Sequence, residues 1–264
     1  MNEPRSTEYS ELLAELYDAI PIYAQRQDVD FYLELARQAA GPVLELGCGT
    51  GRILIPTARA GCRITGLDSS ENMLARCRTR LAAEPEEVRE RVQLLCASMT
   101  KFHLGQPYQL ITTPFRGFQH LLTTEEQLSC LRCVHRHLAP GGTFVLDVFH
   151  TIPAATFDPA WMEEKEDTPE TRLPDGRCFL RTVRVAAFHR SKQMNEVEFV
   201  FYLTHPGGQK ERFVERFRIH YFFRCEVEHL LARAGFRIAA VYGNYDRSPF
   251  TDDSPEMIFV AERE

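Results

Sequence analysis

Residues 43–149 alternate between short apolar runs and amphipathic stretches. The runs are bounded by turn formers, which is typical of buried strands. The stretches between them carry apolar side chains at helical spacing, as the segment before the first run does at Leu12, Leu16 and Ile20. Because this order is characteristic of α/β proteins, it predicts a parallel, doubly wound sheet with right-handed crossovers. The predicted strands are 42–46, 62–68, 91–97, 108–115 and 143–149, and the predicted helices are 7–20, 28–40, 124–138 and two that begin near residues 50 and 71.

Side chains that can cap helices stand at two of these starts. Ser69 or Ser70 can accept a hydrogen bond from the first turn of the helix that follows them. Thr124 is placed to cap the helix 124–138. The turn formers at 139–142 predict a turn before the fifth strand.

After residue 176 the pattern changes to strand-like segments without helices. These segments are separated by turn chemistry, so they predict an antiparallel β meander. The stretch 151–176, rich in Pro, Asp and Glu, is the most loop-like part of the chain. The meander strands are 177–190, 195–205 and 211–223, followed by a helix at 224–235 and strands at 236–243 and 256–262.

The change of pattern suggests three parts. Residues 1–150 form a core with a helical cap at its N-terminus, and residues 151–223 form an antiparallel extension on the expected acceptor side. Residues 224–264 complete the core sheet. The meander could also pair with a second copy across a two-fold axis, so a homodimer is left open.

The formal net charge of -6 narrows the range of partners. Nucleic-acid-binding proteins usually carry a basic face, so a nucleic-acid partner is not expected.

No apolar run approaches the roughly 20 residues that span a bilayer. The polar start of the chain, MNEPRSTEYSELL, is unlike a signal peptide. We therefore expect a cytoplasmic protein that does not bind a membrane.

Eight cysteines are scattered through the predicted strands and helices. In a cytosolic chain we expect them to be reduced thiols that pack as small apolar groups. Cys130, Cys133 and His137 would share one helical face, which suggests a zinc site. Such a site normally takes a second pair of ligands from a distant segment, and the sequence offers no such pair. A packed helix without a metal is the favoured interpretation.

The segment VLELGCGTGR joins the first strand to a helix through three glycines. A dinucleotide site needs the spacing G-x-G-x-x-G, but Arg52 occupies the third position and Gly51 comes one place early. The acid Glu45 stands two residues before Gly47. No lysine follows the glycines, so the segment lacks the side chain that binds a phosphate in a P-loop. Asp68, at the end of the second strand, lies where a carboxylate can accept both hydroxyls of a ribose. A ribose without a pyrophosphate suits a nucleoside that carries an amino acid.

At these residues the chain resembles the class I S-adenosylmethionine-dependent methyltransferases. VLELGCGTGR is similar to their first motif, GLDSSENML to the second, LLCASM to their adenine-binding segment and HLAPGGTFVLDVF to their fifth-strand signature. The resemblance implies S-adenosyl-L-methionine as the methyl donor. It also implies a Rossmann-like sheet of seven strands with the last strand antiparallel, to which 236–243 and 256–262 would add the final pair.

A closer resemblance, to the sugar N,N-dimethyltransferases and glycine N-methyltransferases, covers AELYDAIPIY, TTPFRGFQHLLT and the meander. It implies that Tyr17 lies near the donor and that His120 lies near the acceptor amine, where it is the candidate general base. The residues expected to bind the donor are Tyr17, Glu45, Gly47, Cys48, Gly49, Gly51, Asp68, Ser69, Met73, Ser98, Met99 and Pro114. The residues expected to bind the acceptor are Phe115, Arg218, His220 and Tyr221.

The chain departs from the family pattern at three positions. Ser98 stands where an Asp commonly binds the adenine, and it accepts a hydrogen bond more weakly. Gln109 follows Tyr108 where an acid is usual, and Pro114 replaces a flexible residue at the floor of the pocket. We still expect the donor site with these departures.

Each candidate also has a purely structural explanation. Asp68 could be an acid that favours a helix N-terminus, and Tyr17 could be a core aromatic. His120 could pack or cap, and Arg218 and His220, which share one face of a strand, could be solvated.

We therefore expect a methyltransferase that acts on N, or on O, of a small-molecule acceptor by in-line displacement. Orientation of the reacting groups would be its main catalytic resource. Two alternatives stay open: methylation of a protein or RNA, and a donor-binding protein without transferase activity.

Overall fold

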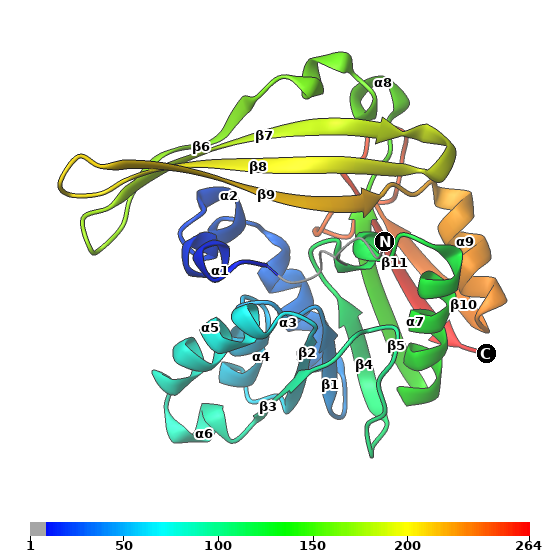
Figure 1. Ribbon diagram of the computed structural model, residues 1–264. Helices are drawn as coiled ribbons and strands as arrows, with labels where there is room; N and C mark the ends of the chain where they lie inside the picture. Colours follow the sequence, from blue (N-terminus) through cyan, green and yellow to red (C-terminus); the bar gives the residue numbers. More distant parts are fainter. Residues whose placement is uncertain (1–8) are drawn as a thin grey trace.

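The computed structural model describes residues 9–264 and shows two β-sheets, one above the other (Figure 1). Residues 1–8, with the polar start and the first two residues of the predicted helix 7–20, lie outside the described residues. The lower sheet has seven strands in the order β10-β11-β5-β4-β1-β2-β3. The upper sheet has four strands in the order β6-β7-β8-β9.

The seven-stranded sheet has the predicted doubly wound, Rossmann-like topology. Neighbouring strands from β3 to β5 pair in parallel, whereas β11 pairs antiparallel with both β5 and β10. The expectation that the last strand is antiparallel is therefore confirmed. The strands of this seven-stranded sheet are β1 (Val43–Leu46), β2 (Ile64–Asp68), β3 (Val92–Cys96), β4 (Tyr108–Thr113), β5 (Leu138–Phe149), β10 (Phe236–Tyr242) and β11 (Glu256–Arg263).

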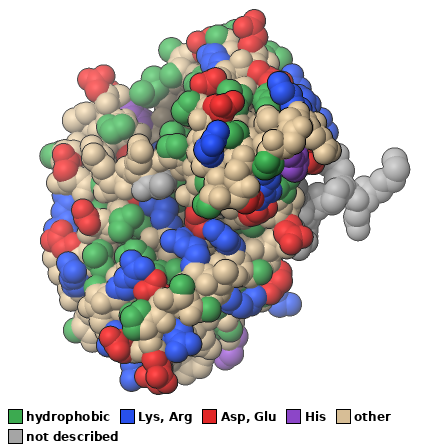
Figure 2. Space-filling model, turned by 90° about the vertical axis from the view of Figure 1, so that its left-hand side faces the viewer, with side chains coloured by type: hydrophobic (Ala, Val, Ile, Leu, Met, Phe, Trp, Pro, Cys, Tyr) green, Lys and Arg blue, Asp and Glu red, His purple; other side chains and the backbone are tan. Residues whose placement is uncertain are grey.

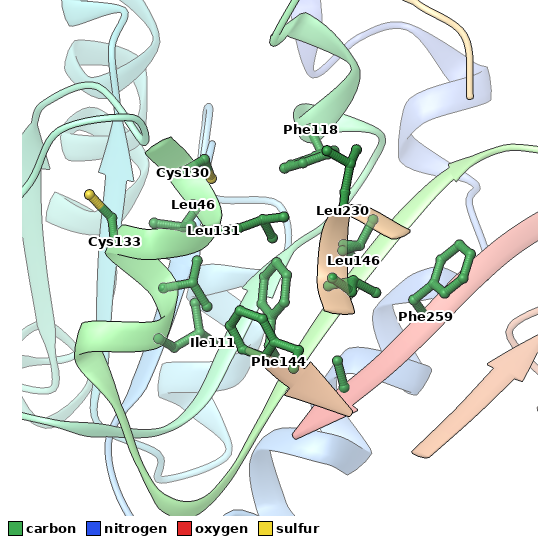
Figure 3. Close-up of a cluster of buried hydrophobic side chains, with 14 of the residues drawn as sticks. Leu46, Ile111, Phe118, Cys130, Leu131, Cys133, Phe144, Leu146, Leu230 and Phe259 are labelled. Atoms are coloured by element: carbon green, nitrogen blue, oxygen red, sulfur yellow. The ribbon is translucent and has the colours of Figure 1, made fainter. Parts of the chain in front are cut away.

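Helices cover both faces of this sheet. On one face lie α3 (Asp28–Gln38), α4 (Leu54–Arg59) and α5 (Glu71–Ala82), with the short α6 (Glu86–Arg89) nearby. On the other face lie α7 (Thr124–His137) and α9 (Arg224–Arg233). Figure 3 shows this second core, where side chains from α7 and α9 pack against apolar residues of the strands. The two cores bury the sheet on both sides, which is why its strands read as continuous apolar runs.

Cys130 and Cys133 lie on α7 and pack into this second core (Figure 3). His137 does not join them in a metal cluster, because its Nδ1 lies 2.7 Å from the Cys133 carbonyl and its Nε2 accepts from the backbone N–H of Leu104. No group of three or more His, Cys, Asp or Glu side chains among residues 9–264 is placed to hold a metal ion.

Two local predictions need correction. The residue that caps α7 is Thr123, not Thr124, because the side chains of Thr123 and Glu126 each accept from the other's backbone N–H. The predicted turn 139–142 lies inside β5, where pairing with β4 jumps and Gly141 adopts a φ of 72°. An irregular strand and a turn share the same residues, so local sequence does not separate them. Ser70 caps α5, as one of the two predicted candidates.

The four-stranded antiparallel sheet confirms the predicted meander and adds a strand to it. Its strands are β6 (Lys165–Arg172), β7 (Cys178–His189), β8 (Met194–Thr204) and β9 (Lys210–His220). The stretch 151–176, expected to be the most loop-like, contains α8 (Pro153–Thr156), the 3₁₀ helix η2 (Pro159–Met162) and β6. The polar β6 forms by pairing its backbone with β7, an interaction that its own sequence does not signal.

The upper sheet rests on the N-terminal helices α1 (Glu11–Tyr17) and α2 (Pro21–Ala24), which lie between it and the lower sheet (Figure 1). Leu13, Leu16 and Ile20 pack against Phe179 and Phe201 of its inner face. This cluster, together with the contact of the 3₁₀ helix η1 (Gly117–His120) with β9, sets the position of the upper sheet, and the 3₁₀ helix η3 (Arg190–Lys192) joins β7 to β8 within it.

Acidic and basic side chains lie side by side on the face shown in Figure 2. Ion pairs of the described residues include Arg76 with Asp18 and Arg59 with Glu84. In the described part of the chain, no helix combines the length and the apolar character needed to cross a membrane.

Candidate active site

A cavity of about 530 Å³ lies between the carboxyl ends of β1, β2 and β4 and the inner face of the upper sheet. In doubly wound folds this edge of the sheet is where ligands bind. Of the residues predicted to bind the donor, those that line the cavity are Tyr17, Gly47, Gly49, Asp68, Ser69, Met73, Ser98, Met99 and Pro114.

The glycine loop after β1 forms the floor of this cavity. Gly47 and Gly49 have φ values of 73° and 53°, in the left-handed region that favours glycine. A Cβ atom at Gly49 would meet no other atom within 4 Å. The loop is therefore held open towards a ligand. Gly51 does not line the cavity, and a Cβ there would lie 2.7 Å from the sulfur of Cys77 on α5, so its absent side chain allows the helix to approach.

Asp68 ends β2 beside this loop. Its Oδ2 accepts from the backbone N–H of Gly49, and its Oδ1 accepts from that of Ser70, each at 2.8 Å. Burial raises the pKa of Asp68, and these backbone hydrogen bonds act in the opposite direction. Each carboxylate oxygen keeps further acceptor capacity that can receive a ribose hydroxyl. Ser98 and Met99, from the adenine-like segment, line the same part of the cavity.

Glu45 and Cys48 lie behind the loop and do not line the cavity. Both are buried. Burial raises the pKa of Glu45 to about 8, and its Oε2 has no hydrogen-bond partner among the described residues. Burial also raises the pKa of the Cys48 thiol. Their predicted contact with the donor stays a prediction.

His120 ends η1 and lines the cavity. Its Nε2 lies 3.5 Å from the hydroxyl of Tyr9, and the two rings meet edge to face. Burial lowers the pKa of His120 to about 4, so its imidazole is neutral near pH 7. Burial raises the pKa values of Tyr9 and Tyr17, which also line the cavity. These phenols therefore keep their protons.

The backbone between β4 and η1 is strained at two non-glycine residues. Phe115 and Arg116 have φ values of 54° and 64°. Asp147 holds both, because its Oδ2 accepts from the N–H of Phe115 and its Oδ1 from that of Arg116. Strain of this kind persists where the surroundings enforce it, often at functional sites. Phe115, predicted to contact the acceptor, lines the cavity.

The other three predicted acceptor residues do not line the cavity. Phe217 and Ile219 are the residues of β9 that do, so the alternation of the strand places Arg218 and His220 on its other face. Arg218 pairs with Glu196, and His220 lies 3.0 Å from Glu226. Tyr221 donates to the carbonyl of Arg190.

The sequence interpretation missed an ion pair in this wall of the cavity. Arg181 of β7 is fully buried and binds Asp167 of β6 through two hydrogen bonds of 2.9 and 2.8 Å. A third hydrogen bond joins Arg181 to the hydroxyl of Tyr23. The alternating apolar residues of the meander, such as Val197 and Phe199, signal which face points inward, but the sequence does not reveal that an arginine and an aspartate share that face.

A cluster of paired charges lies at another side of the cavity. Arg26 lines the cavity and binds Asp28 and Glu256, and Arg116 binds the same Glu256 at 2.7 Å. Arg52 completes the cluster through two hydrogen bonds to Asp28. None of these contacts was predicted, and apart from the pair of Arg26 with Asp28 they join residues that are far apart in the chain.

Residues 43–142 match the family model described as a methyltransferase domain. The chain is 27% identical over 222 residues to the cypemycin N-terminal methyltransferase of a Streptomyces species, covering 84% of this chain and 83% of the relative. It is also 27% identical over 220 residues to the dTDP-3-amino-3,4,6-trideoxy-alpha-D-glucopyranose N,N-dimethyltransferase of Streptomyces venezuelae, covering 83% and 85%.

Solved structures of similar fold cover nearly the whole chain. The CcbJ methyltransferase of Streptomyces caelestis superposes with a TM-score of 0.75 at 25% identity, over 98% of this chain and 97% of that one. The SAM-bound amino pentose methyltransferase CalS10 of Micromonospora echinaspora superposes with a TM-score of 0.70 at 24% identity, over 100% of both chains.

Proposed function

We propose that this chain, a class I S-adenosylmethionine-dependent methyltransferase, acts by methylating an amine nitrogen of a small-molecule acceptor. One observation carries the proposal. A single cavity joins the glycine loop and Asp68 to His120 and to the inner face of the upper sheet. Donor and acceptor can therefore meet in one enclosed space.

The residues present fit the donor. The open space beside Gly49 admits a ligand close to the backbone, and Asp68 offers carboxylate oxygens at the same edge. We assign the ribose to Asp68 and the adenine end to Ser98 and Met99. When bound, S-adenosylmethionine supplies an electrophilic methyl group on a sulfonium, so the leaving group needs no acid.

His120 and Tyr17 are the proposed catalytic residues. His120 is a weak base because burial lowers its pKa to about 4. It therefore suits a hydrogen bond from an amine N–H better than full proton removal. Such a bond orients the nitrogen lone pair, while the amine product can keep its proton until it leaves the cavity. Tyr17, which keeps its own proton, can donate to a polar atom beside the reacting groups.

Beyond these two side chains, the cavity can promote methyl transfer by orienting donor and acceptor and by excluding water. The aromatic rings of Tyr23, Phe115 and Phe217 line the cavity. Holding two reactants in line can contribute up to about 7–11 kcal/mol in favourable intramolecular reactions.

Comparison with the cypemycin enzyme favours a second acceptor for testing. That relative is named as an N-terminal methyltransferase, so the amine could be the N-terminus of a peptide. The other relative described above is named for an amino sugar. Methylation of RNA and donor binding without catalysis gain no specific support from the described residues.

The experiment is a donor titration followed by an acceptor screen. Calorimetry with S-adenosylmethionine should give saturable binding, and a panel of sugar, alkyl, aryl and peptide amines should release S-adenosylhomocysteine with at least one member. No binding at millimolar donor would contradict the proposal. Binding without product for any amine would favour the non-catalytic alternative.

We also propose the division into 1–150, 151–223 and 224–264, a cytoplasmic location and a homodimer as predictions for test. Limited proteolysis should cut first near the junctions at about 150 and 223 if these parts are units. Light scattering at several protein concentrations measures the oligomeric state directly.

A further inference from the structure

The acceptor half of the cavity has a mostly apolar wall. The upper sheet contributes Val183, Val197, Phe199, Phe217 and Ile219, and α2 contributes Tyr23. A wall of this kind stabilises an apolar body and penalises an unpaired charge.

The cations that line the cavity are already paired. Among the described residues, the arginines that line it are Arg26, Arg116 and Arg181. Arg26 and Arg116 both bind Glu256, and Arg181 binds Asp167. A diphosphate would have to displace these carboxylates or remain uncompensated in an apolar cavity. Both outcomes cost more than the contacts return, because breaking a buried ion pair leaves one charge alone.

Asp167 is a charged group of this wall with spare acceptor capacity. Its Oδ1 accepts from Arg181 and from the hydroxyl of Thr168, whereas among the described residues its Oδ2 accepts from Arg181 alone. A carboxylate oxygen accepts two hydrogen bonds, so Oδ2 can receive another. Its side chain is 19% exposed, and the residue lines the cavity.

We propose that the acceptor is a small amine with an apolar body, without a phosphate or nucleotide group, that carries a second hydrogen-bond donor bound by Asp167. This inference rests on the proposed function and deepens it. It assigns Asp167 as a specificity-determining residue at the wall of the upper sheet.

The fluorescence of Trp161 can measure the binding of an amine in the cavity. Trp161 is the sole tryptophan of the chain and it lines the cavity, so its fluorescence reports binding without turnover. The enzyme is saturated with S-adenosylhomocysteine and titrated with two matched pairs of probes. The pairs are phenethylamine with tyramine, and cyclohexylamine with its hydroxylated analogue. A thymidine-diphosphate amino sugar is the fifth probe.

The native enzyme should bind at least one hydroxylated amine about tenfold more tightly than its unhydroxylated partner, since the bond is to a charged group. Asp167→Asn should remove this preference. Glu198→Gln is the matched control, because Glu198 also binds arginine, here Arg184 and Arg216, but lies on the other face of the sheet from the cavity-lining Val197 and Phe199. It should keep the preference.

Asp167→Asn removes the counter-charge of the buried Arg181 and could therefore unfold the protein. A second variant separates loss of the hydrogen bond from loss of the fold. The double substitution Asp167→Leu with Arg181→Met replaces the ion pair by apolar groups, an exchange that is often neutral for stability. It should stay folded, bind the donor and bind both members of a pair equally.

Three results would overturn the proposal: tighter binding of the nucleotide sugar than of any free amine, no response of Trp161 to any amine, or an intact hydroxyl preference in both variants. Loss of donor binding in the native enzyme would instead contradict the methyltransferase function itself. The two failures are therefore distinguishable.

Discussion

The carboxylate of Asp68 accepts a 2.8 Å hydrogen bond from the backbone N–H of Gly49. This bond ties the end of β2 to the loop after β1. The oxygen atoms of Asp68 are therefore oriented before a ligand arrives. Because the side chain is already ordered, ligand binding costs less conformational entropy.

Asp68→Ala should weaken binding of S-adenosylmethionine by about 1.5–3 kcal/mol, as expected for loss of a hydrogen bond to a charged group. Calorimetry measures the change. Glu71→Ala, at an exposed position in the first turn of the next helix, should leave the affinity unchanged. Equal affinities for both variants would mean that the ribose binds elsewhere.

Gly49→Ala and Gly61→Ala form a matched pair. Both glycines have positive φ, and a Cβ atom at either would meet nothing within 4 Å. Each substitution should therefore cost about 1–2 kcal/mol of stability from backbone strain. Only Gly49 lines the cavity, so only Gly49→Ala should also weaken donor binding. Normal donor affinity in a folded Gly49→Val or Gly49→Ala protein would contradict the proposed loop.

His120→Ala should lower kcat by about 100-fold, the scale of a lost orienting contact, with little change in donor affinity. His120→Asn should recover part of the rate if the ring orients the amine. Steady-state kinetics with a verified acceptor measure both. His205→Ala, in the turn between β8 and β9, is the control. Normal turnover by His120→Ala would make this histidine structural.

The stability of the protein should fall between pH 6.5 and pH 4 partly through His120. Its folded pKa of about 4 lies below the unfolded value of 6.5, so the unfolded chain binds more protons in this window. Going from about pH 7 to about pH 5, the native protein should lose about 1–2 kcal/mol more than His120→Asn. Urea unfolding of both proteins at the two pH values tests this, and identical losses would contradict it.

Asp28→Ala should destabilise the fold by about 3–5 kcal/mol, because it leaves Arg52 without the carboxylate that it binds and removes one of the two carboxylates that bind Arg26. Asp28 is fully buried and binds both Arg52 and Arg26. Burial alone would raise the pKa of Asp28, but its hydrogen bonds and charges with these arginines lower it overall. Glu84→Ala, which breaks the exposed pair with Arg59, should cost less than about 1 kcal/mol. Thermal and urea unfolding compare the two, and similar costs would show that the buried cluster tolerates an unpaired cation.

The sequence by itself determined the glycine loop and the end of β2, where we propose that the donor binds. A short strand, a glycine turn and a helix are local in the chain, so their geometry follows from residues that are neighbours in sequence. Gly47, Gly49 and Asp68 therefore lie where the pattern placed them, and the order of strands and helices predicted the sheet.

Only the tertiary structure decided the wall formed by the upper sheet, where we propose that the acceptor binds. Alternation along β9 separates an apolar set of side chains from a polar set, but that the apolar face covers this cavity depends on the helices that pack beneath the sheet. Leu13 and Leu16 of α1 pack against the inner face, and Phe217 rather than Arg218 lines the cavity. The pairing of Asp167 with Arg181 likewise joins β6 to β7, two strands whose contact arises from backbone pairing rather than from any local pattern.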